Sequence, residues 1–457
     1  MGKDPLAWLD SLKELGMNVH LEKTATLLAR LEMPQHAFPS IHVAGSNGKG
    51  TCCAILSNAF TLAGTCTGLF TSPHLHRVEE RIRIDGVPIT SNRLRSCLKR
   101  VRAAALRKPI TMPTYFEATF LAAMIAFADR GVERAIIETG LGGRFDATRL
   151  VDADCCILTE LALEHTDILG DTLAKIAYEK ASIVRQGRPF IAAWTYDNEA
   201  RAVIEGVVRD HSTAWWWRGD REKGIRFKDA DEPYRPLPKN SAFDGWIPYK
   251  MEAAMLARNA LWAMGEQKAY EAVDSAVTHT NWPGRMQWHE YEGVPLLLDA
   301  AHNPSGMARA CEQIRFQKSR DEAPMPGVIL VGCTLQNDLH AFLQPLVELI
   351  VEGEINHIFV TQPKDGRRPP MPCRALNNAL RDHGIDALFR SEEDPLEALE
   401  MACATALTLD EDTPPPVLCI GSLYLVGNIL HGMGMDTPEE MSILIPQRGA
   451  DDADPEA

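Results

Sequence analysis

The sequence predicts an α/β fold with two doubly wound parts, and three observations support this prediction. Short apolar runs alternate with helix-period segments along most of the chain, which is typical of a mostly parallel sheet covered by helices. A glycine-rich loop, from Gly45 to Gly50, joins one such run to a helix. After an irregular stretch, a second series of strands and helices begins at Pro295.

The elements of the first half follow from apolar spacing and from stop signals. Leucines at helical spacing give two helices within residues 4–32, Gly64 ends the helix after the loop, and Ser91 is expected to cap another. In the helix from Tyr115 to Asp129, apolar side chains including Phe120 and Phe127 share one face. The other expected elements are strands at residues 41–43, 67–70, 134–138, 155–159 and 190–193, a hairpin at 81–89, and helices at 52–63 and 173–184.

The pattern dissolves between His211 and Tyr249 into charges, prolines and the run Trp215-Trp216-Trp217. Three tryptophans could stack on an aromatic ligand, but we expect a small antiparallel elaboration that covers the sheet, because neighbours on a strand point to opposite faces. A helix from Lys250 to Lys268 and a hinge at residues 281–285 come next. The later elements are strands at 295–298, 327–331, 357–360 and 417–420 and helices after Ser305 and near 374–383.

These elements suggest a domain at residues 1–285, a second at 286–445 and a disordered tail at 446–457, whose residues are acidic and small. The chain of 457 residues with 45% hydrophobic content has enough material for two or three cores. Its formal charge of −15 argues against broad nucleic-acid binding and favours a small substrate in a local basic pocket.

We expect a cytoplasmic protein without a membrane partner. No apolar run is long enough to span a bilayer, and the N-terminus carries Asp4, Asp10 and Glu14, unlike a signal peptide. The 11 cysteines include adjacent pairs in apolar segments and no C-x-x-C spacing, so we expect reduced core thiols rather than disulfides or a zinc site.

The segment from Ile41 to Thr51 predicts a phosphate-binding loop between a strand and a helix. Glycines let backbone N–H groups approach a polyphosphate, Lys49 adds a charge, and the Thr51 hydroxyl can reach a phosphate-bound magnesium ion. The loop departs from the strict G-x-x-x-x-G-K-[ST] pattern, because Gly45 is too close to Gly48 and Gly50 separates Lys49 from Thr51. The alternative is a tight turn with a surface lysine.

Further polar groups follow predicted strand ends, where ligands bind in such folds. They are Ser72, Glu138, the Glu164-His165-Thr166 triplet and the Tyr178-Glu179-Lys180 triplet. A hydroxyl, a carboxylate and an imidazole beside a phosphate loop would suit a magnesium ion shared with a nucleotide. Taken singly, each also has a plain reading: a buried acid, a loop histidine and a solvated lysine.

In the order and spacing of its motifs, the chain resembles the Mur ligase superfamily and, within it, the folylpolyglutamate synthase and dihydrofolate synthase branch. The resemblance extends over nearly the whole chain. The matching stretches are His42 to Thr51, Ser72 to Leu75 with Glu80 to Gly86, Phe116-Glu117, Glu138 to Thr148, His165-Thr166 with Leu169-Gly170, Glu179-Lys180, Trp282 to Arg285, Asp299 to Pro304, and Gly421 to Leu425.

The resemblance implies a P-loop-containing doubly wound N-terminal ATPase domain, a smaller Rossmann-like C-terminal domain, and a role for each matching residue. Lys49, Lys180 and His302 would be catalytic, and Lys180 looks like a lysine that this family often carbamylates. Thr51, Ser72, Glu138 and His165 would hold Mg²⁺. ATP would contact Gly45, Ser46, Asn47, Gly48, Lys49, Gly50, Thr51, Asn259, Arg285 and Asp299, and the acid substrate would contact His74, Phe116, Glu117, Arg144 and Asp146.

Three departures from the family pattern concern the adenine and glutamate contacts more than the phosphate site. Glu164 stands where the family usually has aspartate, Met255-Leu256 replaces a His-Gln pair, and Asn337-Asp338 replaces a lysine-aspartate pair.

The predicted function is an ATP- and Mg²⁺-dependent ligase that joins L-glutamate to dihydropteroate, to a folate, or to both, with a bifunctional enzyme favoured. ATP would phosphorylate a carboxylate, and the amine of glutamate would attack the acyl phosphate. A monovalent cation is an additional cofactor candidate, and a monomer is expected. The alternatives are a related ligase for another acid and amino acid, and an ATP-driven switch that ligates nothing.

Overall fold

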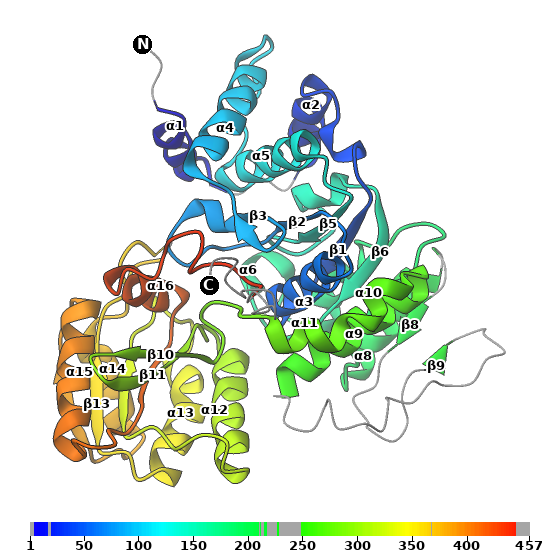
Figure 1. Cartoon of the computed structure of the whole chain (residues 1–457). Coiled ribbons are helices and arrows are strands. Elements are labelled where there is room, and N and C mark those ends of the chain that lie inside the picture. The colour runs from blue at the N-terminus through cyan, green and yellow to red at the C-terminus, as the bar shows by residue number, and fades with distance from the viewer. Residues whose placement is uncertain are drawn as a thin grey trace, which may run out of the picture.

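The computed structural model describes residues 4–16, 20–209, 211, 214–216, 226–227, 248–366 and 368–444. Two β-sheets, each covered by helices, form two parts that lie side by side (Figure 1). Within the described residues, no helix is both long and apolar enough to cross a membrane.

The first part contains a nine-stranded sheet in the order β4-β3-β2-β5-β1-β6-β7-β8-β9. Its strands are β1 (Ser40–Ala44), β2 (Thr67–Phe70), β3 (Ile82–Ile84), β4 (Val87–Pro88), β5 (Arg134–Glu138), β6 (Ala153–Leu158), β7 (Phe190–Ala192), β8 (Ala214–Trp216) and β9 (Arg226–Phe227). The six central strands, in the order β2-β5-β1-β6-β7-β8, pair in parallel. At the two edges, β3 and β4 on one side and β9 on the other add antiparallel pairs.

Helices cover both faces of this sheet (Figure 1). One face carries α1 (Pro5–Ser11), α2 (Glu22–Arg30), α4 (Ser91–Leu106), α5 (Tyr115–Arg130), α7 (Leu173–Ala181) and α8 (Asn198–Arg209), and the other carries α3 (Lys49–Leu62), α9 (Pro248–Met264), α10 (Gln267–Glu271) and α11 (Val273–His279). Alternate strand residues feed the two cores, as Ile136 and Ile137 of β5 do. The short α6 (Thr166–Leu169) follows β6.

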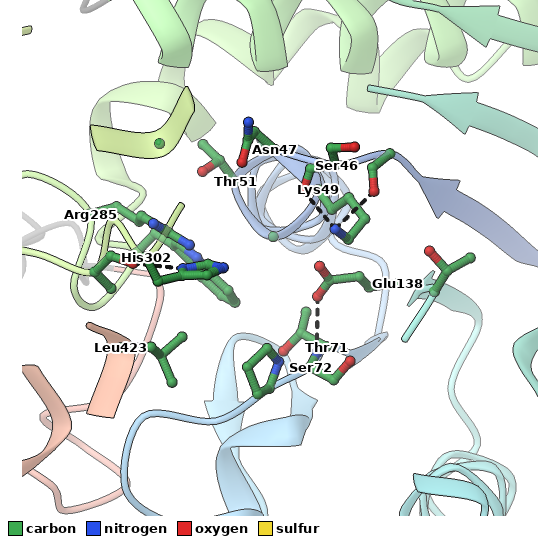
Figure 2. A pocket seen from close by; sticks show the side chains of 18 of the residues that line it. Ser46, Asn47, Lys49, Thr51, Thr71, Ser72, Glu138, Arg285, His302 and Leu423 are labelled. Carbon is green, nitrogen blue, oxygen red and sulfur yellow. Dashed lines mark hydrogen bonds between the residues drawn. The ribbon is translucent and has the colours of Figure 1, made fainter. Parts of the chain in front are cut away.

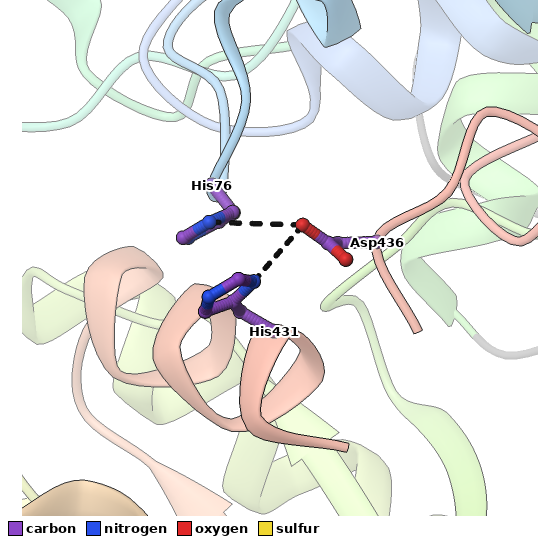
Figure 3. Close-up of side chains that lie close together, drawn as sticks. All are labelled: His76, His431 and Asp436. Carbon is purple, nitrogen blue, oxygen red and sulfur yellow. Dashed lines mark hydrogen bonds and ion pairs between the residues drawn. The ribbon is translucent and has the colours of Figure 1, made fainter. Parts of the chain in front are cut away.

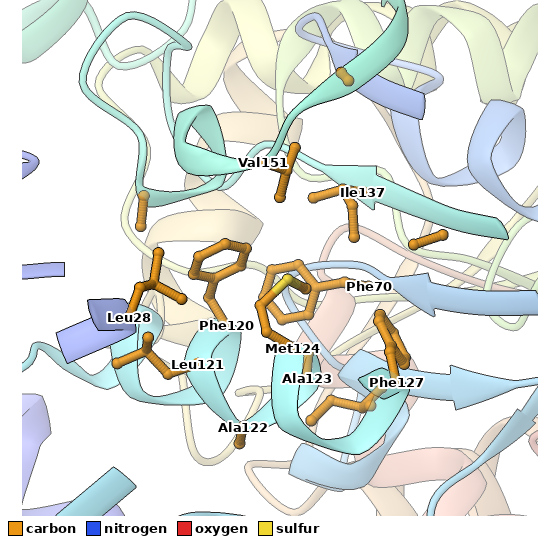
Figure 4. Packing of buried hydrophobic residues seen from close by; sticks show 14 of the residues in the cluster. Leu28, Phe70, Phe120, Leu121, Ala122, Ala123, Met124, Phe127, Ile137 and Val151 are labelled. Carbon is orange, nitrogen blue, oxygen red and sulfur yellow. The ribbon is translucent and has the colours of Figure 1, made fainter. Parts of the chain in front are cut away.

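Helix α5 is apolar on nearly all sides because it is buried on all sides. It is buried from Glu117 to Phe127, between the sheet and its neighbours α2 and α4. Figure 4 shows Phe120, Met124 and Phe127 packed against Phe70 of β2, with ring centroids of Phe70 and Phe120 at 5.8 Å. The face that the sequence predicts is therefore present, but the opposite side of the helix is buried too.

The second part has a six-stranded sheet in the order β10-β11-β15-β12-β13-β14, parallel except for the β10–β11 pair. Its elements are β10 (Gln287–Tyr291), β11 (Val294–Asp299), α12 (Pro304–Ser319), β12 (Val328–Val331), α13 (Leu339–Glu352), β13 (His357–Val360), α14 (Cys373–Asp382), β14 (Leu388–Ser391), α15 (Pro395–Leu409), β15 (Val417–Ile420) and α16 (Leu423–Gly432). Helices α12 to α14 cover one face, and α15 and α16 cover the other.

The chain crosses between the two parts twice. The segment from Asn281 to Met286 leads from α11 into β10, and the segment around Ile443 returns and is buried in the core beside α3. Asn58 of α3 donates to the Thr280 hydroxyl at 2.7 Å and to the Ile443 carbonyl at 2.9 Å, and Thr280 pairs with Leu444 in an antiparallel bridge. The two crossings therefore run side by side.

Most predicted strands appear within one or two residues of their expected bounds. The predicted core position of the cysteines is confirmed for all but Cys66, which is only partly buried. Two expectations are wrong in detail. The helix α4 is capped by Thr90, whose side chain accepts from the Arg93 N–H, and not by Ser91. The strands β8 and β9 extend the edge of the sheet instead of covering it, and most of the 211–249 segment, including Trp217, lies outside the described residues.

Candidate active site

A cleft lies between the two sheets, at the carboxyl ends of β1, β2, β5 and β11 (Figure 2). The phosphate loop, Ser72, Glu138 and Lys180 line it from the first part, and Arg285, Asp299 and His302 line it from the second. Figure 2 shows Lys49 and Glu138 facing Arg285 and His302 across open space. Chemistry-bearing side chains that are far apart in the sequence thus meet at one place.

The phosphate loop has the backbone that its glycines predict. Gly45 adopts φ +147°, and a Cβ there would lie 1.9 Å from Thr159 Oγ1, so no other residue fits. Gly48 adopts φ +79° and is the residue before the first turn of α3. Lys49 Nζ donates to the carbonyls of Gly45 at 3.0 Å and Ser46 at 2.9 Å, which holds the ammonium over the helix N-terminus.

Packing explains why a glycine stands at position 50, where the loop departs from the strict pattern. A Cβ on Gly50 would lie 2.9 Å from the Trp282 ring, so the absent side chain lets the indole rest directly on the first turn of α3. The Arg83 guanidinium also lies over the indole, 5.2 Å from the Trp282 ring centroid. Trp282 thus connects the phosphate loop to the segment that leads into the second part.

Lys180 is buried behind the loop, with 2% of its side chain exposed. Its ammonium donates to the Gly45 carbonyl at 2.7 Å and pairs with Glu164 Oε1 at 2.8 Å. Burial lowers the pKa of Lys180. Burial also acts to raise the pKa of Glu164, but the charges of Lys180 and Lys49 lower it to about 2, so the glutamate is an anion at neutral pH.

Glu138, Ser72, Thr51 and His165 offer the ligands that a divalent cation would need. Glu138 ends β5 and accepts the Ser72 N–H at 3.0 Å, and burial raises its pKa. Its carboxylate keeps further lone pairs for a cation, and the hydroxyls of Thr51 and Ser72 are hard oxygen donors. His165 is exposed in a left-handed conformation, with φ 48°, at the start of α6. All four residues line the cleft.

The second part contributes two cations, Arg285 and Arg309, together with the Asp299 carboxylate and the His302 imidazole. Asp299 ends β11 and accepts the N–H groups of Met286 at 3.0 Å and Ala301 at 2.9 Å. Those two bonds fix the backbone at two places: at Met286, which follows Arg285, and just after β11 at Ala301. His302 Nδ1 lies 3.0 Å from the Ala300 carbonyl, which assigns the proton to Nδ1 and leaves Nε2 as an acceptor.

Two groups join the parts beside the cleft. Asn47 Nδ2, in the phosphate loop, donates to Ser305 Oγ of α12 at 3.0 Å. Arg309, also in α12, pairs with Glu160 and Glu252 of the first part, both at 3.0 Å. The loop that is expected to hold phosphate is therefore in contact with the second part.

The predicted acid-binding residues are not among the described residues that line this cleft. Phe116 packs on Gly140, Glu117 caps α5 and accepts from the Thr24 hydroxyl at 2.8 Å, and Arg144 pairs with Glu179 at 2.6 Å. Asp146 accepts the N–H groups of Gly140, Leu141 and Thr148. His74 Nδ1 accepts from Arg81 Nε at 2.8 Å.

Asn259, a predicted ATP contact, lies in α9 and also outside the cleft lining. Its Nδ2 atom is buried without a hydrogen-bond partner among the described residues. Met255 and Leu256, which depart from the family pattern, are buried residues of the same helix.

The sequence does not predict the contacts of several cleft residues, although Arg83 and Trp282 stand in the matching stretches. Glu164 was noted only within its triplet, and the contacts of Arg83, Trp282 and Arg309 join segments far apart in the chain. The one available signal was Gly50, because a glycine at that position needs a neighbour that excludes a side chain.

Comparisons with known proteins agree with this geometry. The model of the Mur ligase middle domain matches residues 43–230. The dihydrofolate synthase/folylpolyglutamate synthase of Bacillus subtilis (strain 168) is 31% identical over 338 residues, which cover 70% of this chain and 77% of that protein. The dihydrofolate synthetase of Saccharomyces cerevisiae is 29% identical over 445 residues, which cover 91% of this chain and 98% of that protein.

Solved structures give the same picture. Escherichia coli FolC in complex with DHPP and ADP superposes with a TM-score of 0.73 at 27% identity, covering 95% of this chain and 98% of that one. A bifunctional folylpolyglutamate synthase/dihydrofolate synthase with Mn, AMPPNP and L-glutamate bound gives a TM-score of 0.70 at 25% identity, with coverage of 94% and 98%.

The two α/β parts and the cleft between them define an ATP-dependent ligase of the Mur ligase type. More narrowly, the chain belongs to the dihydrofolate synthase/folylpolyglutamate synthase family.

Proposed function

We propose that this enzyme joins L-glutamate to both dihydropteroate and reduced folates in two Mg²⁺- and ATP-dependent reactions. The observation that carries the proposal is the cleft, in which a phosphate loop and acidic residues of one part face Arg285 and His302 of the other. Bacterial relatives that match this chain are named for both activities. The solved relatives hold a nucleotide with DHPP in one case and with L-glutamate in the other.

The residues support transfer of the terminal phosphoryl group of ATP to a substrate carboxylate. The N–H groups from Gly48 to Thr51 lie at the start of α3, where they can bind a phosphate group of ATP. The ammonium of Lys49 lies on the same loop and can reach the same phosphate. Arg285 adds a cation from the opposite wall. Such positive charges stabilise the negative charge of a transferring phosphoryl group.

The second step is attack by the amine of glutamate on the acyl phosphate, and it needs no protein nucleophile. His302 is placed to accept a proton through Nε2, because its Nδ1 proton is held by the Ala300 carbonyl. The contacts of Asn47 and Arg309 hold the second part next to the phosphate loop while the acyl phosphate exists.

Mg²⁺ would be held by Thr51, Ser72, Glu138 and His165, and their mainly oxygen donors fit a hard cation. When bound, the ion offsets the charge of the ATP phosphates. The carbamylation of Lys180 that the resemblance implies remains a prediction. As an ammonium, Lys180 already has two partners, so its conversion to a carbamate requires Glu164 to release the pair. Labelled bicarbonate should give a carbamate NMR signal that is absent from Lys180→Arg.

The decisive assay supplies ATP and L-glutamate together with either dihydropteroate or a reduced folate monoglutamate. We expect amide product and phosphate release with each acid, and both should require glutamate. Product from only one acid would contradict the bifunctional assignment while leaving the ligase intact. ATP hydrolysis that is indifferent to both acids would instead support the switch alternative.

A further inference from the structure

A second group of polar side chains joins the two parts away from the cleft. His76 comes from the loop after β2, His431 from the last turn of α16, and Asp436 from the loop that follows α16. Figure 3 shows the two imidazole rings stacked, with the carboxylate at their edge. The ring centroids are 3.8 Å apart, and Asp436 Oδ2 lies 3.6 Å from His76 Nε2 and 3.1 Å from His431 Nδ1.

The backbone that presents His76 is fixed. The Glu80 carboxylate accepts the N–H groups of Leu75, His76 and Arg77 at 2.6–2.9 Å, which locks this loop into one shape. The loop also presses on α16 at Gly427, where a Cβ would lie 2.2 Å from the Leu75 carbonyl. His431 lies one helical turn after Gly427 and therefore on the same face of α16.

From this arrangement we propose that His76, His431 and Asp436 form a binding site for a transition-metal dication of the Zn²⁺ or Co²⁺ class, bridging the two domains. The three ligand atoms lie within 4.8 Å of one another. In a tetrahedral site with Zn–N distances of about 2.0–2.1 Å, two ligand atoms are separated by about 3.3 Å. The two separations that involve Asp436 Oδ2, 3.1 Å to His431 Nδ1 and 3.6 Å to His76 Nε2, lie on either side of this value.

The donor types select the metal. Two imidazoles favour Zn²⁺, Co²⁺ and Ni²⁺ over Mg²⁺, which prefers oxygen ligands, so the site is chemically distinct from the proposed Mg²⁺ site. The His431 side chain is 58% exposed, so solvent can reach the site and fill a fourth position.

One neighbouring charge opposes a cation. Arg77 Nη1 lies 3.8 Å from Asp436 Oδ2 and is half exposed. Removing this guanidinium should tighten metal binding, because the neighbouring charges that remain, on Asp436 and Glu80, are both negative. An effect of that sign is specific to a metal at this place.

The test measures Co²⁺ and Zn²⁺ binding to the full-length, tag-free protein by equilibrium dialysis and by the visible absorption of Co²⁺. Excess Mg²⁺ and ADP are present throughout to occupy the cleft. The wild type should bind one Co²⁺ with a tetrahedral spectrum, and His431→Gln and Asp436→Asn should each weaken binding by at least about tenfold. Arg77→Met should strengthen it.

The matched control is His340→Gln, which alters an exposed histidine pair of the second part, with His340 Nδ1 and His383 Nε2 3.2 Å apart. This variant should bind like the wild type. Circular dichroism confirms that each variant is folded. If the wild type binds no Co²⁺, or if His431→Gln and Asp436→Asn bind it unchanged, the three side chains are a plain hydrogen-bonded contact and the proposal is wrong.

Discussion

Two ammonium groups converge on one carbonyl oxygen at the centre of the cleft. Lys49 Nζ and Lys180 Nζ lie 3.0 and 2.7 Å from the Gly45 oxygen, and only Lys180 has a carboxylate partner, Glu164, within ion-pair distance. The backbone at Gly45 is therefore held by two positive charges, and the two lysines differ in their availability to a ligand. Lys49 is the cation available to a ligand, whereas Lys180 is a buried member of a pair.

Lys49→Ala should lower turnover by roughly a thousandfold, because it removes a charge placed where negative charge develops. The fold should persist, since Lys49 bonds only to carbonyls of its own loop. Phosphate release and the thermal midpoint check the two parts of this expectation. Lys364→Ala, which removes an exposed lysine paired with Asp394 in the second part, is the control and should leave turnover near normal.

Glu164→Gln should reduce stability in a pH-dependent way. The folded-state pKa of Glu164, about 2, is below its ordinary value of 4.5, so its contribution is complete above pH 4.5 and is lost between pH 4.5 and 2. The wild-type advantage should be on the order of 3 kcal/mol at pH 6 and should shrink steadily towards pH 3. Urea unfolding of both proteins across this range measures it, and a difference independent of pH would contradict the buried ion pair.

At the scale of elements, the sequence predicts most strands because buried parallel strands are continuous apolar runs, as Arg134 to Glu138 and His357 to Val360 show. It misses β10 because this edge strand carries charged and polar residues. The residues that we expect to bind phosphate and metal all line the cleft, as predicted from their places just after strand ends. The contacts of Trp282 and Arg309 could not, since they depend on how one sheet packs beside the other.

Gly50→Ala should impair the coupling between α3 and the crossing segment. The new methyl group would lie 2.9–3.0 Å from the Trp282 ring, so the indole must move and carry the Arg285 segment with it. We expect lower turnover and a changed tryptophan emission. Gly206→Ala in α8 is the matched control, because nothing lies within 4 Å of its Cβ, and it should stabilise the helix by about 0.5–1 kcal/mol. Equal activity of both variants would refute the contact.

At the scale of the whole molecule, the two parts are held together by charge near the cleft. Arg309 is the central group, since it bonds to both Glu160 and Glu252. Burial raises the pKa of Glu252, and the Arg309 charge acts against this rise. The Arg309–Glu160 ion pair lies beside Asn47, which donates to both Glu160 and Ser305. The position of the second part and that of the phosphate loop therefore depend on each other.

Arg309→Met should therefore lower kcat at saturating ATP by about tenfold or more, because the catalytic groups of the two parts are no longer held in register. Arg315→Met is the matched control on the same helix. Arg315 has nearly the same exposure, 30% against 29%, but pairs with Glu348 and Glu352 of its own part. Steady-state kinetics of the two variants decides the point, and equal losses would show that α12 and not the bridge is responsible.

The paired crossings at Thr280 and Leu444 constrain how this enzyme can move. Two chain segments joined by a β-bridge form a double-stranded hinge. One part can rotate about this hinge, but twisting or sliding of one part against the other would break the bridge. Cutting the chain in the Asn281 to Met286 segment would leave the halves tethered, and the Ile443 side chain would keep its place in the core beside α3. The second part is thus anchored in the first at both of its ends, by the segment before Met286 and by the segment around Ile443.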